Sequence, residues 1–448
     1  MSRKLWKKLL STHREGEDTN DLPDNAVRSP FMRDYDRIIF SSAFRRLKDK
    51  TQVFPLAKSD YVRTRLTHSL EVASVGRSLG FLAGELLEKK DHLPKKISPN
   101  DTATIVATAC LAHDIGNPPF GHAGEAAIQE WFAGDGKRFL KGMSNYERQD
   151  FLQFEGNAQG LRILSKLQHP DQKGGLRLTC AVMGTITKYP RKSKVNKSQA
   201  VGKSGDKFGI MQSEFEYFKN IAERLALVKK PGKDLAWKRH PFAFLVEAAD
   251  DICYKIIDIE DGFKDGLISI HHLEDLHAPW LENRDQDKLR NLSNDYAKAE
   301  YLRAKLIGAI ISEAHAVFEE KYDLIISGEF DDSLINNIRH KNEFSKFKEL
   351  TREKVYAKKE ILELETAGFK VIGGLLNSFM CAVDDYSKNP KTRKTSTEKL
   401  IGLLRKSANV ESAHTAYEKA QIVADFVSGM TDSYALDLYQ RISGISPT

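Results

Sequence analysis

The segment 110–125 places two histidines and two acids directly after an apolar run. His113 and Asp114 are adjacent in this segment. A buried His–Asp pair is costly to desolvate unless something compensates it, and a bound cation is the usual compensation. The pair therefore predicts a metal site, whose other ligands must come from elsewhere in the chain.

Two further ligand candidates lie far from this pair in the sequence. His68 opens a helical pattern upstream, and Asp250 lies within a helical pattern downstream. Together with His113 and Asp114 they form a nitrogen and oxygen ligand set without a thiolate. Such a set suits Mg²⁺, Mn²⁺ or another divalent transition metal with open water positions, rather than a closed structural zinc site.

His122 and Glu125 are three residues apart, so on a helix they share one face. A carboxylate bonded to one ring nitrogen fixes the tautomer and leaves the other nitrogen free for proton transfer. The pattern therefore predicts an acid/base pair beside the metal. The simpler alternative is a surface hydrogen bond at a helix N-terminus.

Seven blocks of the sequence, together with the ordered set of His68, the His113–Asp114 pair and Asp250, resemble one enzyme family. They are similar to the bacterial dGTP triphosphohydrolases of the HD-domain phosphohydrolase superfamily. The resemblance runs from about residue 25 to about residue 440, and its blocks are 44–55, 63–72, 113–122, 154–159, 187–190, 249–254 and 429–435.

This resemblance implies metal-dependent hydrolysis of dGTP, or of other dNTPs, at the α-phosphorus. The products would be a deoxynucleoside and tripolyphosphate, so the enzyme would control dNTP pools. In this family His122 would be the general acid/base and Glu125 its orienting partner. The base preference and stimulation by a second, allosteric dNTP are not determined by the sequence.

The resemblance also implies a set of substrate contacts. Tyr254 would pack where a ribose 2′-OH would lie, and Gln52 and Asp258 would bond the 3′-OH. Asp250, Tyr254 and Asp258 are spaced to share one helix face. Arg65, Lys188 and Tyr189 would contact the triphosphate. The alternatives are an ordinary core-edge tyrosine at 254 and an exposed strand residue at 52.

Bulk properties set limits on the class of protein. The chain has 448 residues, is 41% hydrophobic and carries a net charge of +7, which favours an anionic partner. It shows neither a bilayer-length apolar run nor a signal-peptide core, which predicts a cytoplasmic protein. The cysteines lie in apolar helical contexts and are expected to be reduced core thiols: Cys110, Cys180, Cys253 and Cys381.

Hydrophobic periodicity predicts an all-α fold with a few short strands. We expect one large helical unit over residues 1–448, with a metal-binding core at about 60–260. Residues 261–448 would supply the base pocket and the contacts of a homo-oligomer, a hexamer or tetramer. Predicted helices are 67–90, 101–113, 157–168, 176–188, 213–228, 241–259, 286–321, 352–387, 411–429 and 434–442, with extended pieces at 52–54 and 264–272.

The basic stretch 190–207 reads as a mobile, solvated loop, with a lid or a nucleic-acid contact as alternatives. Two other functions stay open beside dNTP hydrolysis. One is an HD-domain phosphatase acting on other nucleotides. The other is a single-stranded DNA-binding protein in which hydrolysis is secondary.

Overall fold

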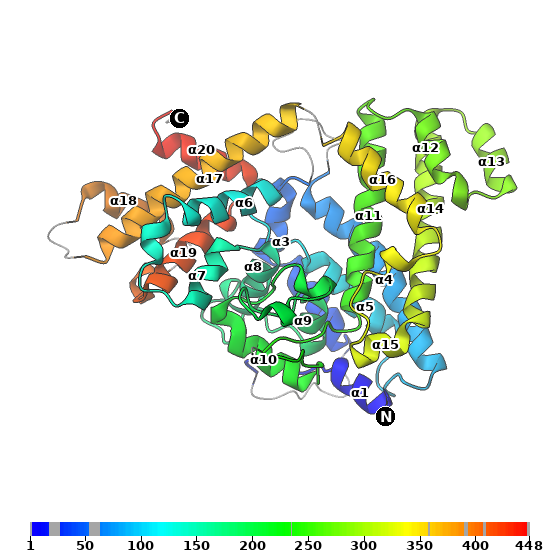
Figure 1. Cartoon of the computed structure of the whole chain (residues 1–448), viewed down its shortest axis with the longest axis horizontal. Coiled ribbons are helices and arrows are strands. Elements are labelled where there is room, and N and C mark those ends of the chain that lie inside the picture. Colours follow the sequence, from blue (N-terminus) through cyan, green and yellow to red (C-terminus); the bar gives the residue numbers. More distant parts are fainter. Residues whose placement is uncertain are drawn as a thin grey trace.

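The structure, a computed structural model, describes residues 2–17, 27–52, 63–233, 235–356, 359–388, 393–405 and 409–445. It confirms the predicted all-α class, because helices dominate these residues and strand-like pairing is limited to isolated bridges such as that of Thr51 with Thr64 (Figure 1). Of the extended piece predicted at 52–54, only Gln52 lies within the described residues.

The extended piece predicted at 264–272 is wrong. Helix α11 (Ala243–Lys264) ends in a turn at Gly266, whose φ is +71°, and helix α12 (Ile270–His277) begins shortly after it. The amides of Leu267 and Ile268 donate back to the Gly262 carbonyl. The apolar residues of this stretch therefore belong to a helix-ending turn, which favours glycine in the left-handed conformation.

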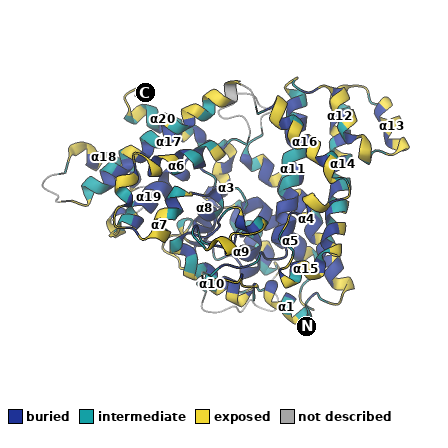
Figure 2. Cartoon of the chain, in the orientation of Figure 1, coloured by how far each residue is buried: buried dark blue, intermediate teal, exposed yellow. Residues whose placement is uncertain are grey.

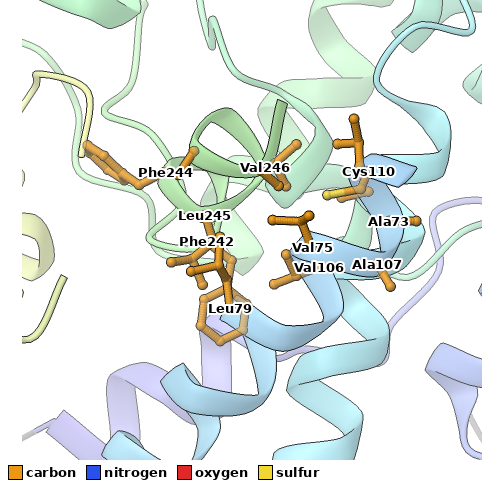
Figure 3. Packing of buried hydrophobic residues seen from close by; sticks show 14 of the residues in the cluster. Ala73, Val75, Leu79, Val106, Ala107, Cys110, Phe242, Phe244, Leu245 and Val246 are labelled. Atoms are coloured by element: carbon orange, nitrogen blue, oxygen red, sulfur yellow. The ribbon is translucent and has the colours of Figure 1, made fainter. Parts of the chain in front are cut away.

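The scaffold of the site is a close helix pair, α4 (Arg65–Lys89) and α5 (Pro99–Ala112), which both begin with capping boxes. Glycines let the two helices approach, since a Cβ on Gly80 would lie 2.9 Å from the Ala103 Cα. Helix α11 packs on this pair. Figure 3 shows Val75 and Leu79 of α4 meeting Val106 of α5 and Leu245 of α11.

Buried apolar residues form two clusters, visible as dark blue helices in Figure 2. The first includes α4, α5 and α11. The second joins α6 (Gly121–Ala133) to the C-terminal helices α17 (Lys359–Tyr386), α19 (Ala416–Ser428) and α20 (Asp432–Ile442). The remaining α-helices are α1 (Ser2–Leu9), α2 (Pro30–Ile39), α3 (Ser42–Arg46), α7 (Asn145–Leu152), α8 (Gly156–Arg162), α9 (Cys180–Ile186), α10 (Phe215–Arg224), α13 (Asn283–Arg290), α14 (Asp295–Glu320), α15 (Tyr322–Ser327), α16 (Lys341–Lys354) and α18 (Thr395–Leu404).

Two predicted long helices are each divided in the structure. The pattern at 286–321 spans α13 and α14, because α13 ends at Arg290 and Asn294 then caps α14 through a hydrogen bond from the Ala297 amide. The pattern at 352–387 spans the end of α16 and all of α17. Apolar periodicity continued across both breaks, so it did not reveal them.

The basic stretch 190–207 is packed in part against the protein. Arg191 is buried and donates to the Gly205 carbonyl at 2.8 Å. The Ser193 hydroxyl donates to Asp150 at 2.6 Å. Residues 196–198, 200–202 and 206 are exposed, so the prediction of a solvated loop is wrong only for the parts of the stretch whose side chains find acceptors within the fold.

One described helical segment, Leu362–Tyr386, is long and apolar enough to cross a membrane by length and composition. This differs from the prediction of no bilayer-length apolar run. Its residues Ile372, Leu375, Leu376 and Phe379 are buried in the second cluster. A buried core helix can have the same length and apolar composition as a membrane-spanning helix. All four cysteines are unpaired, as predicted.

Candidate active site

The four predicted metal ligands come together from three helices. His68 lies in the first turn of α4, His113 and Asp114 follow the end of α5, and Asp250 lies in α11. The Asp250 Oδ1 lies 3.2 Å from the His68 Nε2 and 3.6 Å from the His113 Nε2. Ligand atoms of His68, His113 and Asp114 all lie within 4.8 Å of one another.

This cluster fits a divalent cation. The His113 Nδ1 lies 2.7 Å from the Cys110 carbonyl oxygen, which requires a proton on Nδ1 and leaves the Nε2 lone pair facing the carboxylates. The His113 Nε2 is buried without a hydrogen-bond partner. Burial raises the pKa of Asp250, but His113 and His68 outweigh it and hold that pKa at about 2. An orphaned nitrogen beside ionised carboxylates is the arrangement that a cation completes.

Asp114 is oriented by two further side chains. The Arg65 Nη1 donates to its Oδ2 at 2.6 Å, and the Asn117 amide donates to its Oδ1 at 2.6 Å. Gly121 leaves room for the guanidinium, since a Cβ at this position would lie 2.6 Å from the Arg65 Nη2. Arg65, the predicted triphosphate contact, therefore reaches both the metal cluster and the open cavity.

His122 and Glu125 form the predicted pair in the first turn of α6. The His122 Nδ1 lies 3.1 Å from the Glu125 Oε2, and this hydrogen bond is the main reason why the pKa of His122 is raised. Glu125 is buried, and its Oε1 accepts the Gly156 amide at 2.7 Å. The His122 side chain is 83% exposed, so its Nε2 is available to a bound substrate.

The predicted phosphate residues Lys188 and Tyr189 follow α9 and line the same cavity. The Lys188 Nζ lies 3.2 Å from the Glu247 Oε1 and 5.6 Å from the centre of the Tyr189 ring. Burial lowers the pKa of Lys188, but the Glu247 carboxylate outweighs it, and the pKa is raised overall. Glu247 is itself buried and accepts Arg239 at 2.6 Å.

Of the predicted sugar contacts, Gln52 and Tyr254 line the cavity. The Gln52 Oε1 is buried without a hydrogen-bond partner. Asp258 lies behind the cavity wall and accepts a hydrogen bond from the Tyr356 hydroxyl. The Tyr254 and Tyr356 rings stack with centroids 6.3 Å apart. The pKa of Asp258 is raised to about 7, mainly because the carboxyl group is buried.

Sequence reasoning missed Lys207, Glu247 and Tyr356. The Lys207 Nζ lies 3.0 Å from the Glu155 Oε1 and 3.8 Å from the Glu125 Oε2, and the side chain lines the cavity. Lys207 ends the stretch that had been assigned to a solvated loop. No motif singles out these residues. Glu247 shares a face of α11 with Asp250 and Tyr254 by helical spacing, whereas tertiary contacts alone bring Lys207 and Tyr356 to the site.

Most of these residues surround one cavity of about 530 Å³, and His68 and Asp258 lie outside its lining. Both apolar clusters contribute to its wall, since Phe120 belongs to the second and Val246 to the first. The other lining residues are Thr51, Gln52, Arg65, His113, Asp114, Asn117, Gly121, His122, Glu125, Asn157, Ile186, Lys188, Tyr189, Lys207, Glu247, Asp250, Tyr254, Tyr356 and Glu365.

Comparison with known proteins agrees with this geometry. Residues 65–165 match the HD domain, and residues 337–441 match the phosphohydrolase-associated domain. The chain is 40% identical to a deoxyguanosinetriphosphate triphosphohydrolase-like protein of Synechocystis, over 98% of this chain and 99% of that protein. A protein of the same name in Listeria monocytogenes is 37% identical, over 98% of this chain and 100% of that protein.

The deoxyguanosinetriphosphate triphosphohydrolase of Yersinia enterocolitica is 31% identical, over 98% of each chain. Identity at this level extends along the whole chain and includes both matched domains. The chain therefore belongs to the deoxyguanosinetriphosphate triphosphohydrolase-like proteins of the HD-domain phosphohydrolase superfamily.

Proposed function

We propose that this protein hydrolyses deoxynucleoside triphosphates, with dGTP as the first candidate, to a deoxynucleoside and tripolyphosphate. One observation carries the proposal. One cavity is lined by three of the four metal candidates (His113, Asp114 and Asp250), by the His122–Glu125 pair and by the sugar candidates Gln52 and Tyr254. A phosphatase without sugar selectivity needs only the first two of these three groups.

The cation that His68, His113, Asp114 and Asp250 would hold supplies charge neutralisation at the phosphate and lowers the pKa of a water molecule. The chain adds its own cations around the phosphate tail: Arg65, Lys188 and Lys207. Each is paired with a carboxylate in the structure, so the tripolyphosphate would compete for donors that are already oriented.

His122 would manage the proton at the leaving group. Water adds to the α-phosphorus while the bond from this phosphorus to O5′ breaks, and the departing O5′ takes a proton from the His122 Nε2. The attacking water releases a proton, and His122 is protonated again within the turnover. Glu125 holds the Nδ1 side, which keeps the Nε2 directed outward and favours the protonated ring.

Tyr254 and Tyr356 would form the wall on which the sugar rests. The Tyr254 ring would exclude a 2′-OH, while the Gln52 Oε1, which is buried without a hydrogen-bond partner, would accept a hydrogen bond from the 3′-OH. Asp258 would act through the Tyr356 hydroxyl unless that tyrosine moves aside. The homo-oligomer, the allosteric dNTP, the single-stranded DNA contact and the cytoplasmic location stay predictions from the sequence.

Product analysis tests the proposal. Purified protein would be incubated with each dNTP and with GTP, in Mg²⁺ or Mn²⁺, with and without a second dNTP. Tripolyphosphate and deoxynucleoside, with GTP unreactive, are the expected result. Release of pyrophosphate or orthophosphate would instead assign the protein to another class of HD-domain phosphatase.

A further inference from the structure

The conspicuous motif without a role in the mechanism is the turn 428–433, between α19 and α20. Asp432 in this turn is 1% exposed and lies in the first turn of α20. Its Oδ2 accepts the Thr51 amide at 3.0 Å and the Thr51 hydroxyl at 2.6 Å, and its Oδ1 accepts the Phe120 amide at 3.0 Å. One carboxylate therefore joins two segments that are far apart in sequence.

Both segments lead directly into the site. Thr51 precedes Gln52, and it pairs with Thr64 at the start of α4, which carries Arg65 and His68. Phe120 comes two residues before His122 and caps α6 with a φ of +61°. A left-handed backbone costs free energy at a residue other than glycine, so surrounding contacts must hold it.

The C-terminal region supplies those contacts. The Phe120 amide is held by Asp432, and its ring packs on α17, where a Cβ on Gly368 would lie 3.0 Å from the Phe120 Cγ. Figure 1 shows α17 beside both α6 and α20. The left-handed cap that begins the His122 helix is thus held by residues of the C-terminal region.

A second set of bonds fixes the same turn. The buried Lys50 Nζ donates to the Asn117 carbonyl at 2.5 Å and to the Ser428 carbonyl at 3.0 Å. The Ser433 hydroxyl donates to Asp49 at 2.9 Å. These bonds place the turn 428–433 against residues 49–51 and against the loop that follows Asp114.

We propose that Asp432 is a positioning residue, which fixes the start of α6, and so His122, relative to the strand-like segment that carries Gln52. Its effect on turnover rests on the proposed dNTP hydrolysis; its effect on the His122–Glu125 pair does not. The C-terminal region would thereby complete the site of the N-terminal HD core from behind, without contacting the substrate through Asp432.

Asp432→Asn is the sharp test, because the amide keeps the shape but replaces one accepting oxygen with a donor. Either orientation sets this donor against the Thr51 amide or the Phe120 amide. Asp437→Asn is the matched control, since Asp437 is an exposed residue of the same helix. The measurements are kcat and KM for dGTP, the melting temperature, and the pKa of His122 by NMR of histidine-labelled protein.

We expect Asp432→Asn to lower kcat/KM about 10- to 100-fold, as a small misplacement of a reacting group does. It should also lower the pKa of His122, because the first turn of α6 loosens and the bond to Glu125 is weakened. A merely structural role would lower the melting temperature and leave the pKa of His122 unchanged, which would overturn the proposal. Asp437→Asn should match the wild type in all three measurements.

One outcome separates this inference from the proposed function. If the wild type hydrolyses no dNTP while Asp432→Asn still lowers the pKa of His122, the proposed function is wrong and the positioning role stands.

If Asp432→Asn does not fold, a second pair of variants tests the same bond: Thr51→Val removes only the hydroxyl donor, and Thr51→Ser keeps it. The valine variant should then lose more activity, and more of the His122 pKa shift, than the serine variant; equal values would refute the proposal.

Discussion

At the scale of single residues, the site combines groups that the sequence reveals with groups that it hides. His113, Asp114 and His122 could be found because their types and spacing are unusual in any helical segment. Lys207 could not, because a loop lysine looks ordinary until the fold pairs it with Glu155. Glu247 shares a helix face with Asp250, but its pairing with Lys188 is visible only in the fold. A functional residue can be predicted from the sequence when the residues that define its role lie in the same segment.

The His122–Glu125 bond predicts a pH dependence. Since this bond raises the pKa of His122 and the acid acts when protonated, activity should persist below that pKa and fall as the pH rises above it. Glu125→Gln removes the charge, so the alkaline limb of kcat/KM should move to lower pH and kcat should fall about 100-fold or more. Glu130→Gln, an exposed change in the same helix, should leave the profile unchanged. An unmoved alkaline limb in Glu125→Gln would remove Glu125 from this role.

Tyr254 predicts how the sugar is selected. Tyr254→Ala should relax the exclusion of ribonucleotides and narrow the dGTP/GTP ratio of kcat/KM by about 10-fold or more, since steric exclusion depends on the ring. Tyr254→Phe keeps the ring that stacks near Tyr356 and should keep the ratio. The measurement is hydrolysis of dGTP and GTP by the three proteins. An unchanged ratio in the alanine variant would rule out a steric gate at this residue.

The position of Glu365 in the cavity wall predicts that its carboxylate contributes to the base preference. It lines the cavity from α17, and the described residues supply no ion-pair or hydrogen-bond partner for its carboxylate. Guanine has an edge of N–H groups that can donate hydrogen bonds to a carboxylate. Glu365→Gln should therefore reduce kcat/KM for dGTP more than for dATP, by about 10-fold, in parallel assays of both substrates. Equal losses for both would place the carboxylate away from the base.

At the scale of elements, the site depends on how closely α4, α5 and α11 pack. Apolar periodicity was sufficient to predict that these helices exist. The predicted helix 67–90 corresponds to α4 (Arg65–Lys89), and the predicted helix 241–259 corresponds to α11 (Ala243–Lys264). The breaks at Asn294 and after Lys354, and the turn at Gly266, were not predictable in this way. The break at Asn294 depends on a cap and the turn at Gly266 on a left-handed glycine, both of which leave the apolar pattern unchanged.

Two helix glycines, Gly80 between α4 and α5 and Gly402 in α18, predict effects of opposite sign on stability. Gly80→Ala would press a Cβ against the Ala103 backbone and should destabilise the fold by about 1–3 kcal/mol, the usual cost of overpacking. Gly402→Ala in α18 meets no atom within 4 Å and should stabilise by about 0.5–1 kcal/mol through helix propensity. Urea unfolding of both variants measures the two free energies. A neutral Gly80→Ala would mean that the helix pair can move apart.

Because the metal ligands come from three helices, a bound cation should also tie these helices together. Mn²⁺ at about 100 times its Kd should stabilise the protein by about 2.7 kcal/mol over chelator-treated protein. Asp250→Asn should abolish most of this gain, and Asp275→Asn, an exposed change in α12, should keep it. Thermal unfolding with and without Mn²⁺ gives the comparison. An equal gain in Asp250→Asn would exclude Asp250 as a ligand.

At the scale of the whole molecule, the cavity lies where the two apolar clusters meet, so substrate should stabilise both. His122→Ala should abolish turnover while leaving nucleotide binding largely intact, which permits hydrogen exchange to be followed with dGTP and Mn²⁺ present. We expect slower exchange in residues 113–121 and also in α17 around Glu365, because both line the cavity. Protection confined to α4, α5 and α11 would show that the C-terminal region supports the site without closing on the substrate.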